Sequence, residues 1–297
     1  MQHPELQSEG TSAHGSLAVS SSKTPVQTIK KHAPADEGLA HAVSLWSAHR
    51  QFARSESFTS GADAVLTVAG NVSDNVFLYP LLATTSDDEA SYDHLRARVV
   101  TLEIRNGAAT AVRGALAVGT SAAALVPSQT LPLFLPSLFQ IAQSDQAAVF
   151  HVACESIRQD LAVGGSYEAV YALQHSGALL LNSSSPQECH DLAVVAHVVA
   201  LRLKKLLVHF YDGSRVAREL AKLSVLNQDA LQQITAIETS TITSSSATGV
   251  AEQVQAVMDD LFHVLQKQYK VYEYTGASDA EHVVVVIGEA SAAVEEA

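Results

Sequence analysis

Short runs of Val, Leu and Ala, each long enough for a strand, recur along the chain and alternate with segments of helical pattern. The candidate strands are NVFLYPLL, VVTLEI, AAALV, AAVFHVA, GALLLN, LLVHFYD and HVVVVIG. The segments between them include GAATAVRGALAVG, LPLFLPSLFQIAQ, YEAVYALQH and PQECHDLAVVAHVVALRLKK. Strands that are continuously apolar are typical of a parallel sheet with helices on both faces. The pattern therefore predicts an α/β fold with a mainly parallel sheet.

The chain has 297 residues, enough for one large domain or two small ones. Residues 1–35 are rich in Ser, Thr, His and Gly with little periodicity, so we expect a disordered leader there. We expect an α/β domain at 36–237, which opens with a helix at 36–52. A Ser/Thr-rich loop at 238–249 and a helix at 250–271 should follow it. Residues 272–297 would then be the start of a second, truncated domain.

Composition excludes several classes of function. The net charge of −13 argues against a nucleic-acid partner, because phosphate binding needs clustered Lys and Arg. Cys154 and Cys189 lie far apart, so this chain alone cannot supply the cysteines of an iron–sulfur cluster or a four-cysteine zinc site. Few cysteines suit a reducing compartment, and we expect a cytoplasmic protein. The most apolar stretch, LAVVAHVVALRLKKLLVHF, contains His197, Arg202, Lys204 and Lys205 among its residues, which predicts a buried helix and strand rather than a membrane span.

Three local motifs have a functional interpretation and an ordinary one. His190 and His197 share one helix face, but no third metal ligand is placed by spacing, so we interpret them as ordinary helix residues and expect no metal site. Asp212 and Gly213 end a strand, where parallel sheets bind ligands, yet an Asp-Gly turn that caps a following helix is favoured. The serines at 183–185, followed by Pro186, could bind phosphate at a helix start, but a helix cap is favoured.

Longer runs carry a family resemblance. They are VRGALAVGTSAAALVPSQTLPLFLPSLFQIA, VFHVA, SGALLLNSSSPQECHDLAVVAHVVAL, VHFYDGSR and YEYTGASDAEHVVVVIG. Together they resemble the N-terminal, pyrimidine-binding region of pyruvate:ferredoxin/flavodoxin oxidoreductases, from about residue 75 to the C-terminus. The resemblance implies a thiamin-diphosphate-binding-type α/β domain.

The resemblance also implies changes at three positions that carry chemistry in that family. The glutamate that hydrogen-bonds the cofactor's aminopyrimidine ring corresponds to Arg105, and Glu103 lies about 7 Å away along the strand. A cation about 4 Å from a ring that must gain a proton would oppose protonation by roughly 4 kcal/mol at an effective dielectric constant near 20. The substrate-contacting threonine corresponds to Leu82, and the arginine that would pair with the 2-oxoacid carboxylate corresponds to Glu155.

These changes indicate a retained scaffold without catalytic residues. Its vestigial site would comprise Glu103, Arg105, Gly107 and Asp212, with Glu103 or Asp212, the latter at a neighbouring strand end, as the local anion for Arg105.

TPVQTI and LEIRNGA resemble one branch, the flavoprotein (α) component of fungal-type NADPH sulfite reductase. This implies a non-catalytic domain for scaffolding or subunit assembly in sulfur metabolism, inactive alone and without its own cofactor. FAD, FMN-type and NADPH modules would lie elsewhere in the full-length protein. Its partners would be the β (haemoprotein) subunit or other oxidoreductase subunits, and a homo-oligomer is left open.

The alternative is a pyrimidine-binding subunit of a thiamin-diphosphate-dependent 2-oxoacid:ferredoxin oxidoreductase. A partner chain would then supply the diphosphate and Mg²⁺ half-site. Glu103 or Glu155 would have to replace the lost carboxylate.

Overall fold

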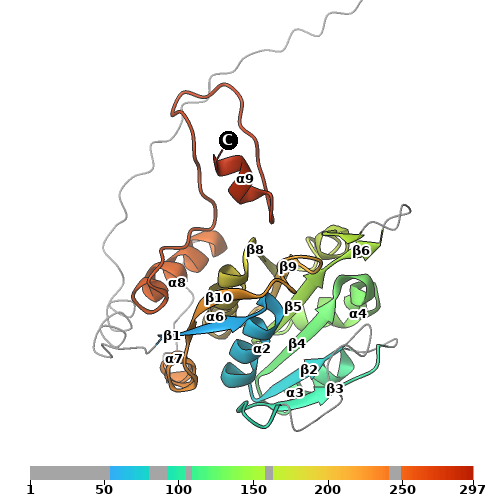
Figure 1. The fold of residues 1–297 in the computed structure, drawn as a ribbon. Helices are drawn as coiled ribbons and strands as arrows, with labels where there is room; N and C mark the ends of the chain where they lie inside the picture. Colours follow the sequence, from blue (N-terminus) through green and yellow to red (C-terminus); the bar gives the residue numbers. More distant parts are fainter. Residues whose placement is uncertain (1–53, 80–91, 105–108, 158–162, 241–248, 297) are drawn as a thin grey trace, which may run out of the picture. The chain divides into compact units, whose positions relative to one another are not determined.

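A six-stranded parallel sheet forms the centre of the protein (Figure 1). The computed structural model describes residues 54–79, 92–104, 109–157, 163–240 and 249–296. In spatial order the strands are β3 (Arg98–Thr101), β2 (Asn75–Leu78), β4 (Ala122–Pro127), β5 (Ala148–Cys154), β9 (Leu206–Asp212) and β8 (Leu179–Ser183). The predicted parallel sheet is confirmed, and six of the seven candidate strands belong to it. The expected leader and the helix at 36–52 lie outside the described residues.

Helices cover both faces of this sheet, as the apolar strands require. One face packs against α2 (Gly61–Val72) and α6 (Pro186–Leu203), and the other against α3 (Thr110–Ala117), α4 (Leu131–Ala142) and the short α5 (Glu168–Tyr171). Alternate residues of one strand serve the two layers, so Val149 of β5 packs on the α6 side and Phe150 on the α4 side. The predicted arrangement of layers is therefore confirmed.

Helix α6 has the start and the burial that its sequence predicts. The Ser185 hydroxyl accepts a hydrogen bond from the backbone N–H of Glu188 at 3.3 Å, and Pro186 occupies the first turn. The Glu188 carboxylate accepts hydrogen bonds from the N–H and the hydroxyl of Ser184, at 2.9 and 2.7 Å. The helix ends where Lys204 takes the left-handed conformation. The serine run is thus a helix cap.

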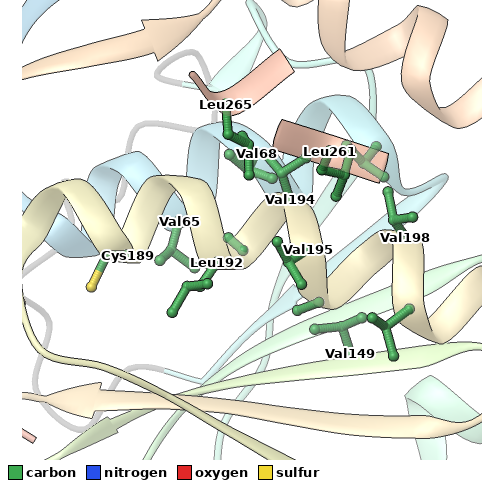
Figure 2. Packing of buried hydrophobic residues seen from close by; sticks show 14 of the residues in the cluster. Val65, Val68, Val149, Cys189, Leu192, Val194, Val195, Val198, Leu261 and Leu265 are labelled. Carbon is green, nitrogen blue, oxygen red and sulfur yellow. The ribbon is translucent and has the colours of Figure 1, made fainter. Parts of the chain in front are cut away.

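A second layer of helices covers the outer side of α6 and α2. Both α7 (Gln228–Ser240) and α8 (Val250–Leu265) contact α6, and α8 contributes Leu261 and Leu265 to the same apolar core as Val194 and Val198 of α6. Figure 2 shows these side chains converging between α2, α6, α8 and β5. Each fully buried Val or Leu contributes roughly 1.5–3 kcal/mol. The helix expected at 250–271 is present over Val250–Leu265, ends before the expected residue 271, and packs on the α/β core.

The sequence reasoning missed helix α2 and an antiparallel two-stranded ribbon. The ribbon pairs β1 (Arg54–Thr59) with β10 (Ala221–Leu226), in the register Arg54 opposite Leu226. The strand sequence RSESFT is largely polar, and Lys222 and Ser224 interrupt the apolar residues of AKLSVL, so neither strand has the continuous apolar character of the central strands. A further short ribbon joins β6 (Ser156–Ile157) to β7 (Val163–Gly164). Helix α7 includes the first three residues of the loop expected at 238–249, and residues 241–248 lie outside the described part.

The strand expected at HVVVVIG (282–288) was a wrong prediction. Within the described residues this segment pairs with no strand, and Val283, Val284 and Val285 are 63–85% exposed. A strand needs the backbone groups of a neighbour as hydrogen-bond partners, and apolar character alone does not supply one. The segment leads into α9 (Ser291–Glu296). No helix in the described part of the chain has the length and apolar character needed to cross a membrane.

Candidate functional site

The carboxyl ends of the six parallel strands meet at one edge of the sheet, the edge at which such sheets bind ligands. Tyr79 follows β2, Glu103 lies just beyond β3, Ser128 follows β4, Glu155 follows β5, and Asp212 ends β9. Tyr79 points into the core, where its ring packs edge-on against Phe134 at 4.9 Å, and burial raises its pKa to about 12. The other four supply polar groups along what we call the carboxyl edge.

Glu155 is held firmly at this edge. Its backbone N–H donates to the Ser128 hydroxyl, which in turn donates to the Glu155 carbonyl, both at 3.1 Å. Its carboxylate pairs with the Arg218 guanidinium at 2.9 Å. A surface hollow of about 380 Å³ lies beside this pair and is lined by Ser128, Gln129, Pro132, Glu155, Ser166, Glu168 and Ala169. The edge therefore carries a cation and an anion beside an open hollow.

Asp212 forms the Asp-Gly turn that its sequence predicts. Its Oδ1 atom accepts hydrogen bonds from the Arg215 backbone N–H at 2.6 Å and the Ser214 hydroxyl at 2.8 Å. The turn leads through residues 213–218 to β10, so the helix expected after it is absent from this described stretch. Gly213 suits this position because a Cβ there would lie 3.1 Å from backbone atoms of Ala153 and Cys154, which is a tight contact. The turn interpretation is confirmed, whereas the helix was wrong.

The second carboxylate oxygen of Asp212 is buried. Oδ2 has no hydrogen-bond partner among the described residues, and a Cβ on Gly165 would lie within contact distance of it, so a glycine at 165 leaves space for this oxygen. Burial and then the charge of Asp212 raise the pKa of the Cys154 thiol, so this cysteine is not a reactive thiolate. The same two causes raise the pKa of Tyr167 to about 12.

Strand order separates the sequence-derived candidates from one another. Because β2, β4 and β5 lie between β3 and β9, Asp212 is not at a strand end neighbouring β3, and that prediction was wrong. At about 4.8 Å per strand, the ends of β3 and β9 are roughly 19 Å apart. Glu103 is exposed beyond β3. Leu82, Arg105 and Gly107 lie outside the described residues, so their expected roles stay predictions.

Sequence reasoning missed two buried polar clusters. In the first, the Asp191 carboxylate receives hydrogen bonds from Arg54 at 2.9 Å, His190 at 2.8 Å and the Tyr269 hydroxyl at 2.9 Å. Burial alone would raise the pKa of Asp191, but the hydrogen bond and charge of His190 and the charge of Arg54 outweigh it and lower that pKa. Arg54 also donates to the Leu265 carbonyl at the end of α8, so this cluster fastens β1, α6 and α8 together.

The second cluster is a histidine line, defined here as His197, His151, His209 and Ser183. The Nε2 atoms of His197 and His151 are 3.2 Å apart, and the Nδ1 atoms of His151 and His209 are 2.9 Å apart. The Nε2 atom of His209 lies 2.7 Å from the Ser183 hydroxyl. All four side chains are buried between α6 and the sheet. Within the described residues, no set of three or more His, Cys, Asp or Glu side chains is arranged to hold a metal ion.

Comparison with known families identifies the relatives of this fold. The model of the family described as pyruvate flavodoxin/ferredoxin oxidoreductase, thiamine diP-binding, matches residues 80–284, which include most of the parallel sheet and its carboxyl edge. The chain belongs to this family. The membership confirms the resemblance to pyruvate:ferredoxin/flavodoxin oxidoreductases.

Individual relatives agree with this membership. The chain is 31% identical over 277 residues to the mitochondrial NADP⁺ pyruvate dehydrogenase of Euglena gracilis, covering 80% of this chain and 15% of that protein. It is 29% identical over 277 residues to a pyruvate-flavodoxin oxidoreductase of a Nostoc species, with 80% and 23% covered. For the pyruvate:ferredoxin oxidoreductase of Moorella thermoacetica the identity is 28% over 276 residues, with 80% and 24% covered. The chain thus spans less than a quarter of these relatives.

A solved structure is also similar. It is a 2-oxoglutarate:ferredoxin oxidoreductase from Magnetococcus marinus, with a TM-score of 0.49 and 17% identity over 59% of this chain and 32% of that one. The relatives in sequence named here are oxidoreductases of pyruvate, and they give no support to the sulfite reductase branch.

Proposed function

We propose that this chain contributes the pyrimidine-binding-type domain to a thiamin-diphosphate-dependent 2-oxoacid oxidoreductase of the pyruvate:flavodoxin/ferredoxin kind. The observation that carries the proposal is the family match over residues 80–284, which spans strands from both sides of the sheet centre. Since the chain covers 15–24% of the pyruvate oxidoreductases named above, the remaining domains or subunits would complete the enzyme.

Glu103 is the carboxylate whose position best fits the cofactor's pyrimidine ring. The candidate carboxylates were Glu103 and Glu155, and three strand spacings, about 14 Å, separate the ends of β3 and β5. Only Glu103 lies at the corner between β3 and α3, which the family resemblance assigns to the ring. Bound thiamin diphosphate would supply carbanion stabilisation, and Glu103 would hold the proton on a ring nitrogen.

Arg218 is our candidate partner for the carboxylate of the 2-oxoacid. Glu155 replaces the family's arginine and by itself would repel an anionic substrate. Arg218 restores a cation at the same place, because its guanidinium pairs with Glu155 at 2.9 Å, and 67% of its side chain is exposed toward solvent. A guanidinium has five N–H donors, so Arg218 can bind Glu155 and a substrate carboxylate together. Glu155 would then act as a positioning residue.

The test uses the native assembly that carries this chain, purified through an affinity tag. We expect pyruvate-dependent reduction of a viologen dye that requires thiamin diphosphate and Mg²⁺. An intact assembly that binds no thiamin diphosphate and reduces no dye with any of several 2-oxoacids would refute the proposal.

Three variants test the assigned residues within that assembly. Glu103→Gln should lower kcat by about 10²-fold or more, the usual scale for a lost acid–base group. Arg218→Ala should mainly raise KM. Glu252→Gln, an exposed position on α8, is the matched control and should change neither. Unchanged kcat in Glu103→Gln would remove the assigned role from that residue.

A scaffolding role in an NADPH sulfite reductase is a second candidate. The observation that favours it is Arg105 at the position that resemblance assigns to the cofactor-binding glutamate. It is distinguished by the same purification: NADPH-dependent sulfite reduction, together with no pyruvate-dependent dye reduction, would support it in place of the first proposal.

A further inference from the structure

The donor and acceptor atoms along the histidine line can be assigned by starting from Ser183, whose partner is a backbone carbonyl. A backbone carbonyl can only accept a hydrogen bond, so Ser183 donates its proton to the Glu188 carbonyl at 3.2 Å. The Ser183 oxygen then accepts from His209, which places the proton of His209 on Nε2. The three rings are neutral, because burial lowers the pKa of each, to about 3 for His197 and His209 and well below 6.5 for His151.

A neutral imidazole has one donor nitrogen and one acceptor nitrogen, so the assignment of one ring determines the assignment of the next. With its proton on Nε2, His209 accepts at Nδ1 from the Nδ1–H of His151. His151 therefore accepts at Nε2 from the Nε2–H of His197. The last free position is Nδ1 of His197, which must be an acceptor. No described residue donates a hydrogen bond to His197 Nδ1.

His197 lines a small cavity at the amino-terminal edge of the sheet. Its volume is about 10 Å³, and the lining consists of Val72, Ser73, Ser121, Ala122, Ala147, Ala148, Val149, His197, Ala200 and Leu201. This volume is close to that of a single water probe, and a buried water needs two to four polar partners. The Ser121 hydroxyl already donates to Asp74 at 2.8 Å, whereas the Ser73 hydroxyl has no partner in the described part of the chain.

We propose that this cavity is a binding site for one ordered water molecule. The water donates a hydrogen bond to His197 Nδ1, shares a second with the Ser73 hydroxyl, and completes the histidine line from the amino-terminal edge of the sheet to the Glu188 carbonyl. The bound species is a small neutral donor, because the cavity has room for one heavy atom and, apart from His197, Ser73 and Ser121, its lining residues are Ala, Val and Leu. This inference is independent of the proposed function.

Nuclear magnetic resonance on the full chain, with ¹⁵N-labelled histidine at pH 7.5, tests the proton positions on the three rings and the presence of the bound water. Long-range ¹H–¹⁵N correlations should show the proton on Nε2 of His197 and His209 and on Nδ1 of His151. A nuclear Overhauser effect should link the His197 ring protons to a long-lived water, while the exposed His263 shows none. The opposite tautomer at His197, or the lack of that water signal, would overturn the proposal.

A variant that fills the cavity gives a second test. Ser73→Val should abolish the water signal at His197 and leave the protons of His151 and His209 in place. Ser55→Val, at an exposed position of β1, is the matched control and should keep the signal. A signal that persists in folded Ser73→Val would contradict the site, and the measurement on the unaltered chain decides the matter should Ser73→Val fail to fold.

Discussion

Mild acid should destabilise this protein through the histidine line. His151, His197 and His209 are buried as neutral rings, and the described residues place no carboxylate in hydrogen-bond contact with any of them. Their neighbours are one another, the Ser183 hydroxyl and the Tyr211 ring, so no counter-ion compensates a proton. Burial therefore lowers the folded-state pKa of His197 and His209 to about 3 and that of His151 well below 6.5.

The magnitude follows from linkage between protonation and folding. In the unfolded chain each histidine titrates near pH 6.5, so below that pH the unfolded state binds protons that the folded state excludes. Stability is full above about pH 6.5 and is lost as the pH falls toward about 3. At pH 5.5 the loss is about 1.4 kcal/mol for each histidine, or about 4 kcal/mol for three.

Urea unfolding followed by circular dichroism at pH 7.5 and 5.5 measures this loss. His197→Gln removes one titrating group, so its stability should fall by about 1.4 kcal/mol less than that of the unaltered chain over this pH range. His263→Gln, at an exposed site, should leave the pH dependence unchanged. A His197→Gln variant with the full pH dependence would refute the reasoning.

Two further predictions concern stability and use the same urea assay. Arg54→Ala should cost about 3 kcal/mol, because it leaves the buried Asp191 carboxylate without its cation; Arg96→Ala, in an exposed pair, should cost at most about 1 kcal/mol, and equal losses would contradict this. Gly213→Ala should destabilise by about 1–3 kcal/mol, because its Cβ would press on backbone atoms at 3.1 Å. Gly114→Ala, inside α3 with nothing within 4 Å, should stabilise by about 0.5–1 kcal/mol, and a loss there would count against the reasoning.

Local sequence patterns were sufficient to predict the elements whose side chains are mostly buried. The continuous apolar runs became the central strands, and Ser185 with Pro186 started α6 as their residue types require. The Asp212–Gly213 turn was likewise predictable, since the Asp side chain accepts hydrogen bonds from the Ser214 hydroxyl and the Arg215 backbone N–H, two and three residues away. These features depend on neighbours within one turn or one strand, and such neighbours can be read from the sequence.

Strand order and partner choice were beyond the sequence. The sheet places β2, β4 and β5 between Glu103 and Asp212, so these two residues cannot belong to one site as the sequence had suggested. Arg218 lies beside Glu155 because the turn after β9 folds back toward the end of β5, and nothing in the sequence indicated this pair. The run at 282–288 has strand character without a partner in the described residues. Patterns of apolar residues indicate which segments are buried, but they do not indicate which segments pack next to one another.

The sequence alone determined the α/β class, the family and the cap of α6. Only the tertiary structure decided that His151, His197 and His209 meet, because they come from β5, α6 and β9 and lie 46 and 58 residues apart along the chain. Parallel pairing sets His151 opposite His209, and the packing of α6 brings His197 to them. Hydrogen bonds between such distant groups form as a consequence of how whole elements pack, since the free energy that selects the packing comes from hundreds of apolar contacts spread over the core.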